Sequence, residues 1–265
     1  AGPIDTYFGQ RICRAVLNEA DLVTVRDSMS KDVLEKCGVR NVIRTADPAF
    51  GINIPTQDII DNYLKSMRLS NGEQYIATTA YNWLHDSDLF RNPTKGMHDL
   101  QTRRERLANS FEVIVNKYNQ EILFVPTVKI DEDGYTVIKE LMPSSGKARV
   151  LDYDTHFNAV FAALSRSNVL IGMRLHSLIL ATLMGVPVVP ISYCGKVKSY
   201  LDLIGMEDLY LDVEELGKEV FTAQLLDNFD MVWEKRSHYI NHQQLAAIRL
   251  RQKAYENAKL VADLL

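Results

Sequence analysis

The pattern of hydrophobic and polar positions indicates short strands that alternate with helices along most of the chain. Apolar runs of about four to eight residues are typical of buried strands, and apolar positions three and four residues apart are typical of helices. The first strands are expected at residues 21–26 and 41–50. Between them we expect a helix that is capped at its N-terminus by Ser28 or Ser30 and stopped by Gly38.

A second and longer series of elements follows. Its expected strands cover residues 74–83, 121–128, 148–153, 169–175, 187–193 and 208–213. Helical patterns of about 10 to 15 residues lie between these strands, and the chain beyond residue 216 is helical in pattern throughout. Strands that alternate with helices in this way predict βαβ units with a parallel sheet, and therefore an α/β protein.

The two series of elements are unequal in length. Only two strands precede residues 51–72, where a proline, a short helical pattern and the pair Asn71-Gly72 predict a linker between domains. Two strands are too few for an independent sheet. We therefore expect the chain to open in the middle of an α/β domain, as a fragment of a longer protein would.

Composition and charge narrow the class of protein. The 265 residues, 46% of them hydrophobic, are enough to bury one large core or two modest ones. The net charge of −4 gives no basic surface for nucleic acid, and no apolar run reaches the roughly 18 residues of a membrane span. The opening residues Ala1-Gly2-Pro3 have neither region of a signal peptide. Three cysteines without paired spacing are expected to be reduced thiols in a cytoplasmic protein.

Three basic residues fall at turns within the most hydrophobic part of the chain, residues 167–200. Arg174 lies at the carboxyl end of an expected strand, His176 begins the next helix, and Lys196 begins the helix after the following strand. In an open parallel sheet, ligands bind outside the carboxyl ends of the strands, and helix starts add N–H groups and a positive dipole end. The pattern predicts an anion site, with Gly172 marking a close backbone approach.

Structural roles for these residues stay open on the sequence pattern alone. A histidine at a helix start can be a core residue, an arginine can pair with a distant carboxylate, and a lysine can be a solvated surface group. In the first series, Arg26 also ends an expected strand at a carboxyl edge. It either pairs with Asp27 and positions the next helix, or it reaches the same site.

Two long blocks of the sequence resemble the polysaccharide pyruvyl transferase family. They are ADLVTVRDSMSKDVLEKCGVRNVIRTADPAF, residues 20–50, and SNVLIGMRLHSLILATLMGVPVVPISYCGKVKSYLDLIG, residues 167–205. The resemblance implies Rossmann-like parallel sheets in a GT-B-like arrangement of two domains, with the active site in the cleft between them. Here the first domain would be truncated and the second complete.

The resemblance also implies where the domains begin and end. Residues 1–50 would be the C-terminal portion of the first Rossmann-like domain, and residues 51–72 the linker. Residues 73–238 would form the second, donor-binding domain. Residues 239–265 would form a helix that packs back toward the domain junction.

Members of the family transfer the enolpyruvyl unit of phosphoenolpyruvate onto a sugar of a cell-surface polysaccharide or its precursor, forming a pyruvate ketal. The resemblance therefore implies phosphoenolpyruvate as co-substrate, a saccharide acceptor that is free or lipid-linked, and no metal or other cofactor. It makes Arg26, His176 and Lys196 the catalytic residues and Arg174 a donor-binding residue. The rest of the expected substrate-binding set is Gly172, Leu175, Ser177, Ser192 and Tyr193. The expected location is cytoplasmic, including the inner face of the membrane.

The sequence departs from the family pattern in two places. Cys194 stands where the family often has an acidic residue, and FVPTVKIDED, residues 124–133, lacks the polar or basic residue that is common after the proline. Within it, the acidic run 131–133 ends in Gly134 and is interpreted as a solvated turn. Candidates for stacking on an acceptor sugar, or for packing under a loop, are Tyr81, Trp83 and His85.

Two other classes of protein remain as alternatives. One is a GT-B glycosyltransferase or sugar epimerase with a nucleotide-sugar donor, for which Glu207 or Asp208 would have to bind the ribose. The other is a non-catalytic saccharide-binding protein that keeps the fold. The sequence leaves the acceptor sugar and the oligomeric state open.

Overall fold

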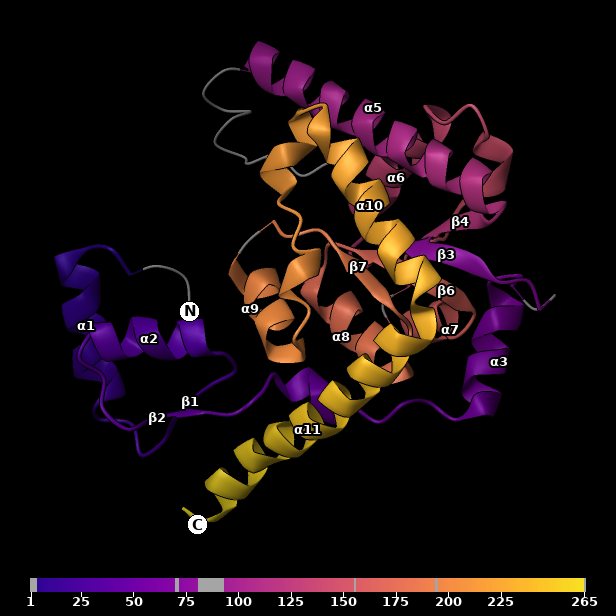
Figure 1. The fold of residues 1–265 in the computed structure, drawn as a ribbon. Coiled ribbons are helices and arrows are strands. Elements are labelled where there is room, and N and C mark those ends of the chain that lie inside the picture. The colour runs from indigo at the N-terminus through magenta and orange to yellow at the C-terminus, as the bar shows by residue number, and fades with distance from the viewer. Residues whose placement is uncertain (1–3, 70–71, 81–92, 155, 194, 265) are drawn as a thin grey trace.

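A five-stranded sheet forms the centre of the computed structural model, which describes residues 4–69, 72–80, 93–154, 156–193 and 195–264. Its strand order is β5-β4-β3-β6-β7, and every pairing is parallel. Figure 1 shows the sheet between the helices. The strands are β3 (Tyr75–Thr78), β4 (Glu121–Phe124), β5 (Ala148–Val150), β6 (Ser167–Gly172) and β7 (Val188–Pro190). They are short and mostly buried, as expected for a parallel sheet that helices cover on both faces.

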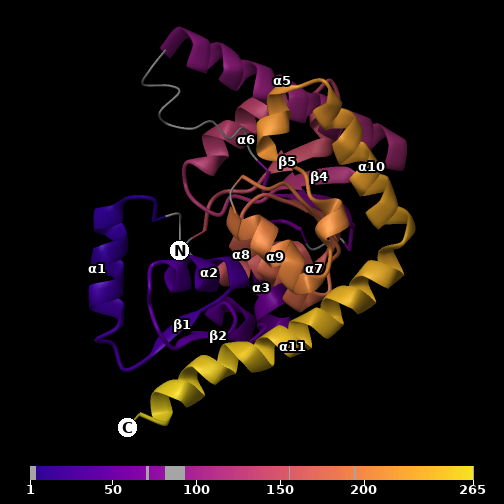
Figure 2. The ribbon, with the colours of Figure 1, turned by 60° about the vertical axis from the view of Figure 1, so that its left-hand side comes forward.

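Helices cover the two faces of this sheet (Figure 2). One face carries α5 (Pro93–Tyr118), α6 (Asp131–Glu140) and α10 (Val220–Glu234). The other carries α7 (Phe157–Ser165), α8 (Leu175–Met184) and α9 (Gly195–Ile204). Large side chains fill the layer between helix and sheet: Phe111 of α5 meets Phe124 of β4 edge to face, with ring centroids 5.5 Å apart. The predicted α/β fold with a parallel sheet is confirmed.

The N-terminal unit is smaller and has its own sheet. It consists of α1 (Tyr7–Leu17), β1 (Val23–Val25), α2 (Ser28–Lys36) and β2 (Val42–Arg44). The two strands pair in parallel, and a separate small core forms around Val23, Leu34 and Val42. This sheet has two strands in the part of the chain that the structure describes.

The start of α2 differs from the sequence prediction. Its N-cap is Asp27, whose Oδ1 accepts a hydrogen bond from the backbone N–H of Ser30 at 2.6 Å, so neither Ser28 nor Ser30 is the cap. All three residue types are good caps, and the extended backbone at Asp27 decides between them. The predicted stop at Gly38 is confirmed, because its φ of +84° is a conformation that glycine adopts without strain.

The segment between the two sheets is packed rather than extended. It contains the short helix η1 (Pro48–Gly51) and α3 (Gln57–Ser66). Ile60 and Leu64 of α3 are buried against Ala162 of α7. The region expected as a linker therefore anchors the chain to the second sheet before β3 begins.

The last helix, α11 (Arg236–Ala262), runs from the second sheet toward the N-terminal unit (Figures 1 and 2). It packs on α8 and η1. Asn257 accepts a hydrogen bond from the Thr45 hydroxyl and donates one to the Ala46 carbonyl. Arg251 donates to the carbonyl oxygen of Ile52. Through these contacts α11 connects the second sheet to the end of the N-terminal unit.

One predicted strand is absent. Residues 208–213 form a single bridge between Ser192 and Asp212, with the short helices η3 (Glu207–Leu209) and η4 (Val213–Gly217) on either side.

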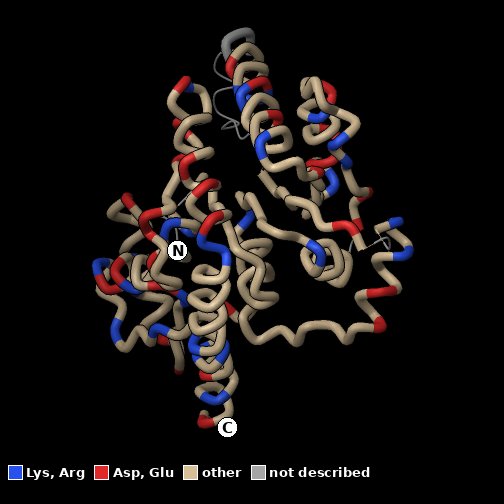
Figure 3. The backbone as a smooth tube through the Cα atoms, turned by 45° about the vertical axis from the view of Figure 1, so that its right-hand side comes forward, with Lys and Arg blue, Asp and Glu red and all other residues tan. Residues whose placement is uncertain are grey.

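Charged residues of both signs are interspersed along the chain (Figure 3). Within the described residues, no helix combines the length and the apolar character needed to cross a bilayer.

Candidate active site

A cavity of about 740 Å³ lies at the carboxyl edge of the five-stranded sheet, facing the N-terminal unit. Arg26 from the N-terminal unit and Arg174, His176 and Lys196 from the second sheet all line it. The four basic residues that the sequence singled out are therefore brought together, although up to 170 positions separate them in the chain.

The turn from β6 to α8 presents two of these side chains. Arg174 is the N-cap residue of α8, with an extended backbone, and His176 is the second residue of the helix. The other residues of α8 are mostly apolar and are buried or half-buried, whereas the His176 side chain is exposed and lines the cavity. The interpretation of His176 as a core residue is therefore wrong. Lys196 has the equivalent second position of α9 and is also exposed.

Arg174 is held by a carboxylate from a different part of the chain. Its Nη2 lies 2.6 Å from Oδ1 of Asp131, whose side chain is 0% exposed. Asp131 begins α6, and its other oxygen accepts hydrogen bonds from the turn that follows β4. The prediction of a solvated turn at residues 131–133 is wrong, because these residues form the first turn of α6 and the Asp131 carboxylate points inward to the arginine.

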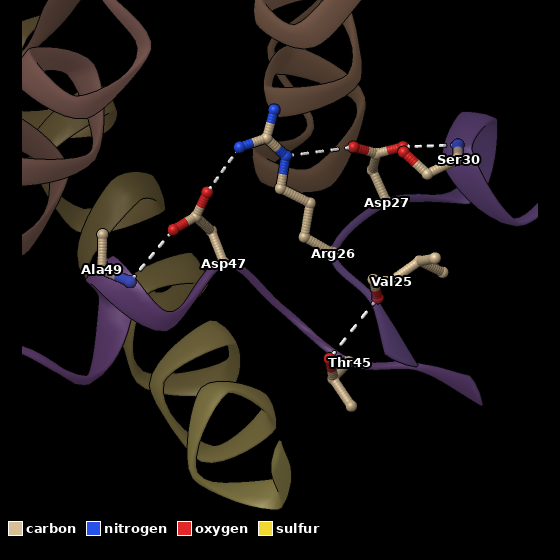
Figure 4. A network of polar contacts seen from close by, with 7 residues as sticks. All are labelled: Val25, Arg26, Asp27, Ser30, Thr45, Asp47 and Ala49. Carbon is tan, nitrogen blue, oxygen red and sulfur yellow. Dashed lines mark hydrogen bonds and ion pairs between the residues drawn. The ribbon is translucent and has the colours of Figure 1, made fainter. Parts of the chain in front are cut away.

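Arg26 is held by two carboxylates (Figure 4). Its Nε lies 3.3 Å from Oδ2 of Asp27, and its Nη1 lies 2.7 Å from Oδ2 of Asp47. Each carboxylate also accepts a backbone N–H at the start of a helix: Asp27 from Ser30, and Asp47 from Ala49 of η1. Arg26 therefore pairs with Asp27 and also lines the cavity, so the two alternatives expected from the sequence occur together.

The cavity combines fixed and unpaired positive charge. Both arginines carry buried or nearly buried carboxylate partners, which fix the planes of their guanidinium groups. Lys196 forms no ion pair with any residue that the structure describes. The two oriented guanidinium groups and the Lys196 ammonium can bind an anion beside the two helix starts. The His176 imidazole can move a proton.

The pKa of Asp27 is lowered by its contacts. Burial raises its pKa, but hydrogen bonds from the backbone and hydroxyl of Ser30 and the adjacent Arg26 guanidinium outweigh this, so that its pKa lies below the ordinary value. Ionised Asp27 therefore stabilises the fold at pH values above about 3.9, its value in an unfolded chain. That contribution is lost as the pH falls through the lower, folded-state pKa.

Replacing Asp27 with asparagine is expected to lower the free energy of unfolding by about 1–2 kcal/mol at neutral pH, because the cap remains but the charge is lost. The difference from the wild type should shrink at acid pH, where Asp27 of the wild type becomes protonated. Urea unfolding between pH 7 and pH 3 measures both. Asp32→Asn, an exposed position of the same helix, is the control, and equal acid dependence in both variants would contradict the prediction.

The remaining predicted site residues fall into two groups. Leu175, Ser177 and Tyr193 line the cavity. Gly172 and Ser192 do not line it among the described residues, and their role in substrate binding stays a prediction. A Cβ on Gly172 would lie 2.4 Å from Cδ2 of Leu178, so its close approach is to helix α8. Outside the described residues lie Tyr81, Trp83, His85 and Cys194.

Sequence reasoning missed several residues of the cavity wall. Asp47 had a detectable signal, because an Asp followed by Pro48 is a typical helix start. Tyr153, His156 and Phe157 follow β5 and line the cavity without any periodic pattern. Phe157 is 63% exposed, which is high for a phenylalanine and leaves its ring accessible from the cavity.

Parallel sheets with a cavity at the carboxyl ends of their strands define an open α/β protein, and the solved structures of similar fold reported below make this fold GT-B-like. The chain belongs to the polysaccharide pyruvyl transferase family, whose model matches residues 1–195. The match includes Arg26, Arg174 and His176 and ends one residue before Lys196. No curated protein matches the chain.

Solved structures of several enzymes are similar to the chain in fold. The chain is similar to UDP-GlcNAc 2-epimerase of Methanocaldococcus jannaschii, with a TM-score of 0.60 and 10% identity over 92% of this chain and 61% of that one. For the enzyme of Neisseria meningitidis the TM-score is 0.64, with 10% identity over 92% and 62%. A UDP-forming α,α-trehalose-phosphate synthase of Burkholderia vietnamiensis gives 0.55 and 13%, over 99% and 67%. These likenesses show the fold alone, and the chain spans about three fifths of the two epimerases.

Proposed function

We propose that the chain carries the donor site of a pyruvyltransferase that moves the enolpyruvyl unit of phosphoenolpyruvate onto a sugar. The observation that carries the proposal is the meeting of Arg26, Arg174, His176 and Lys196 around one cavity. Membership of the polysaccharide pyruvyl transferase family supports a saccharide acceptor. On this proposal the product is a pyruvate ketal on an exopolysaccharide or cell-wall saccharide, formed in the cytoplasm or at the inner face of the membrane on a lipid-linked precursor.

The donor has two anionic groups, a phosphate and a carboxylate, and the cavity offers matching cations. Arginine binds such groups with a planar fork, and lysine binds them as a point charge. We assign Arg174 and Lys196 to the donor anion and the departing phosphate. Arg26 comes from the N-terminal unit and lines the same cavity, where it would hold the carboxylate or the phosphate.

The reaction transfers two protons from sugar hydroxyls, in net terms one to the methylene carbon of the donor and one to the departing phosphate. A proton adds to the methylene carbon of the donor, and a sugar hydroxyl attacks C2 and loses its own proton. The C–O bond to phosphate then breaks, a second hydroxyl of the sugar closes the ketal, and its proton leaves with the phosphate. We assign these transfers to His176, since imidazole titrates near neutral pH and this side chain is exposed to the cavity.

We assign the acceptor to the apolar and aromatic part of the cavity lining. That part includes Ile52, Val128, Tyr153, Phe157 and Val160. An exposed aromatic ring beside half-buried apolar side chains suits the apolar face of a sugar ring. Asp154 lines the same wall and supplies a carboxylate for sugar hydroxyls.

A nucleotide-sugar enzyme is the second candidate, because the fold neighbours named above act on UDP-sugars by their descriptions. That function would need a carboxylate for the ribose. Glu207 and Asp208 lie in η3, and neither is among the residues that line the cavity. A non-catalytic saccharide-binding protein is the third, and it gives no reason for four basic groups at one cavity.

Phosphoenolpyruvate is expected to raise the melting temperature of the 265-residue chain by about 5–10 °C at a hundredfold excess over its Kd. High salt should weaken the effect, because the contact is largely between charges. Differential scanning fluorimetry with phosphoenolpyruvate, UDP-GlcNAc and buffer alone distinguishes the three candidates. Stabilisation by UDP-GlcNAc and not by phosphoenolpyruvate would overturn the proposal in favour of the second candidate.

The same titration tests the role of Arg174. Arg174→Ala should remove most of the stabilisation by phosphoenolpyruvate, and Arg149→Ala, at a partly exposed arginine outside the cavity, serves as the control. Binding that is unaffected by Arg174→Ala would return this residue to a purely structural role as the partner of Asp131.

A further inference from the structure

Asp131 lies behind the wall of the cavity and contacts that wall at two separate places. Its Oδ1 accepts the hydrogen bond from Nη2 of Arg174, at 2.6 Å. Its Oδ2 accepts from the backbone N–H of Thr127 at 3.1 Å, from the Thr127 hydroxyl at 3.2 Å and from the backbone N–H of Val128 at 3.2 Å. Arg174, Thr127 and Val128 all line the cavity, whereas Asp131 is not among the lining residues.

The two contacts come from strands that are not neighbours. Thr127 and Val128 follow β4, Arg174 follows β6, and β3 lies between these strands. Two strand spacings amount to about 10 Å, so one carboxylate joins parts of the carboxyl edge that the sheet itself holds apart. With four hydrogen bonds accepted and no exposed side-chain surface, this carboxylate is fixed in one orientation.

The stability of the fold alone does not explain the ion pair between Asp131 and Arg174. Removing a carboxylate and a guanidinium from water is costly, and apolar pairs often serve equally well at buried positions. The pair does have a consequence for binding. A free arginine loses much rotamer freedom when it binds an anion, whereas an arginine that a carboxylate already orients has lost it beforehand.

We propose that Asp131 is a positioning residue that sets the Arg174 guanidinium and the Thr127–Val128 wall as one unit before the substrate binds. The proposal rests on the proposed function in one respect, namely that Arg174 contacts the donor. Asp131 itself contacts neither the donor nor the acceptor and acts through Arg174.

Asp131→Asn is the decisive substitution. An asparagine carbonyl still accepts from the Thr127 and Val128 N–H groups, but its amide then presents N–H donors to the guanidinium, which has no acceptor. The Kd for phosphoenolpyruvate, measured by calorimetry, is expected to rise about 5- to 30-fold as Arg174 loses its fixed orientation. Asp133→Asn removes the same charge from an exposed position of the same helix turn and should change the Kd less than about twofold.

A second readout follows Arg174 without any donor. Phenylglyoxal modifies accessible arginines, and peptide mass spectrometry gives the rate at Arg174 itself. Release from Asp131 should raise this rate several-fold in Asp131→Asn and leave it unchanged in Asp133→Asn. If the wild type binds no phosphoenolpyruvate, the proposed function fails while the labelling rates still decide the role of Asp131.

The two readouts also separate positioning from a merely structural role. Thr127→Val removes the hydroxyl contact to Oδ2 but keeps the ion pair, so it should leave the labelling of Arg174 at the wild-type rate. A folded Asp131→Asn with unchanged affinity and unchanged labelling would overturn the proposal. If that variant does not fold, crystal structures of the wild type with and without phosphoenolpyruvate decide: Arg174 should remain on Asp131 in both, and its departure on binding would overturn the proposal.

Discussion

His176→Gln is expected to lower the rate of ketal formation by about 10²- to 10⁴-fold, the usual contribution of general acid–base catalysis. Glutamine keeps a polar side chain of similar size and removes the nitrogen that titrates. The exposed position of His176 at the start of α8 means that the fold should survive the change. Steady-state transfer from phosphoenolpyruvate measures the effect, and the melting temperature of the variant verifies that it is folded.

Donor binding and pH dependence give the controls for this prediction. The affinity for phosphoenolpyruvate should fall far less than turnover, because Arg174 and Lys196 remain. The wild-type pH–rate profile should have a limb that the variant lacks, because glutamine does not titrate. The cavity contains a second histidine, His156, and a loss of turnover in His156→Gln instead of His176→Gln would assign the proton transfer to that residue.

The sequence was sufficient to predict those features for which a general rule links the position of a residue in an element to its place in the fold. Parallel strands place their carboxyl ends at one edge, so Arg174, His176 and Lys196 could be expected together without a structure. The helix after β1 and its stop at Gly38 followed from local backbone preferences. These features depend on neighbours in the chain, which a sequence displays directly.

The pattern failed where the partner of a residue is distant in the chain. Asp131 belongs to an acidic run beside a glycine, which is typical of a solvated turn, and only the packing of β4, β3 and β6 brings Arg174 to it. Residues 208–213 have a strand-like composition, yet they form one bridge, from Asp212 to Ser192 beyond the end of β7, because the chain turns into η4 directly afterwards. Neither outcome has a local signal.

Arg26 has one feature that the sequence shows and one that it does not. Its substitution has the second large effect that we expect on turnover. Its position at the end of a strand was visible in the sequence, whereas its contact with Asp47, 21 residues further on, was not. The two carboxylates use Nε and Nη1, and they orient the guanidinium at the cavity wall (Figure 4). Nη2 of Arg26 has no hydrogen-bond partner within the described residues, which leaves the N–H groups of this nitrogen for a ligand.

Arg26→Lys is therefore expected to lower turnover by about 10²-fold, since an ammonium group cannot hold Asp27 and Asp47 in the same geometry and still present a fixed N–H donor to the substrate. The loss of one carboxylate contact should also lower the free energy of unfolding by about 1–3 kcal/mol. Steady-state transfer and urea unfolding measure the two effects on the same protein. Arg44→Lys, at the exposed end of the neighbouring strand β2, is the matched control and should change neither by much.

Asp27→Asn separates the two roles of Arg26, because it removes one of the same contacts without changing the arginine. A purely local role predicts that Asp27→Asn lowers turnover as much as Arg26→Lys does. A role at the donor predicts a much larger loss for Arg26→Lys, since the guanidinium lines the cavity and Asp27 does not. Lost stability with retained turnover in Arg26→Lys would show that Arg26 serves only to join α2 and η1 to the end of β1.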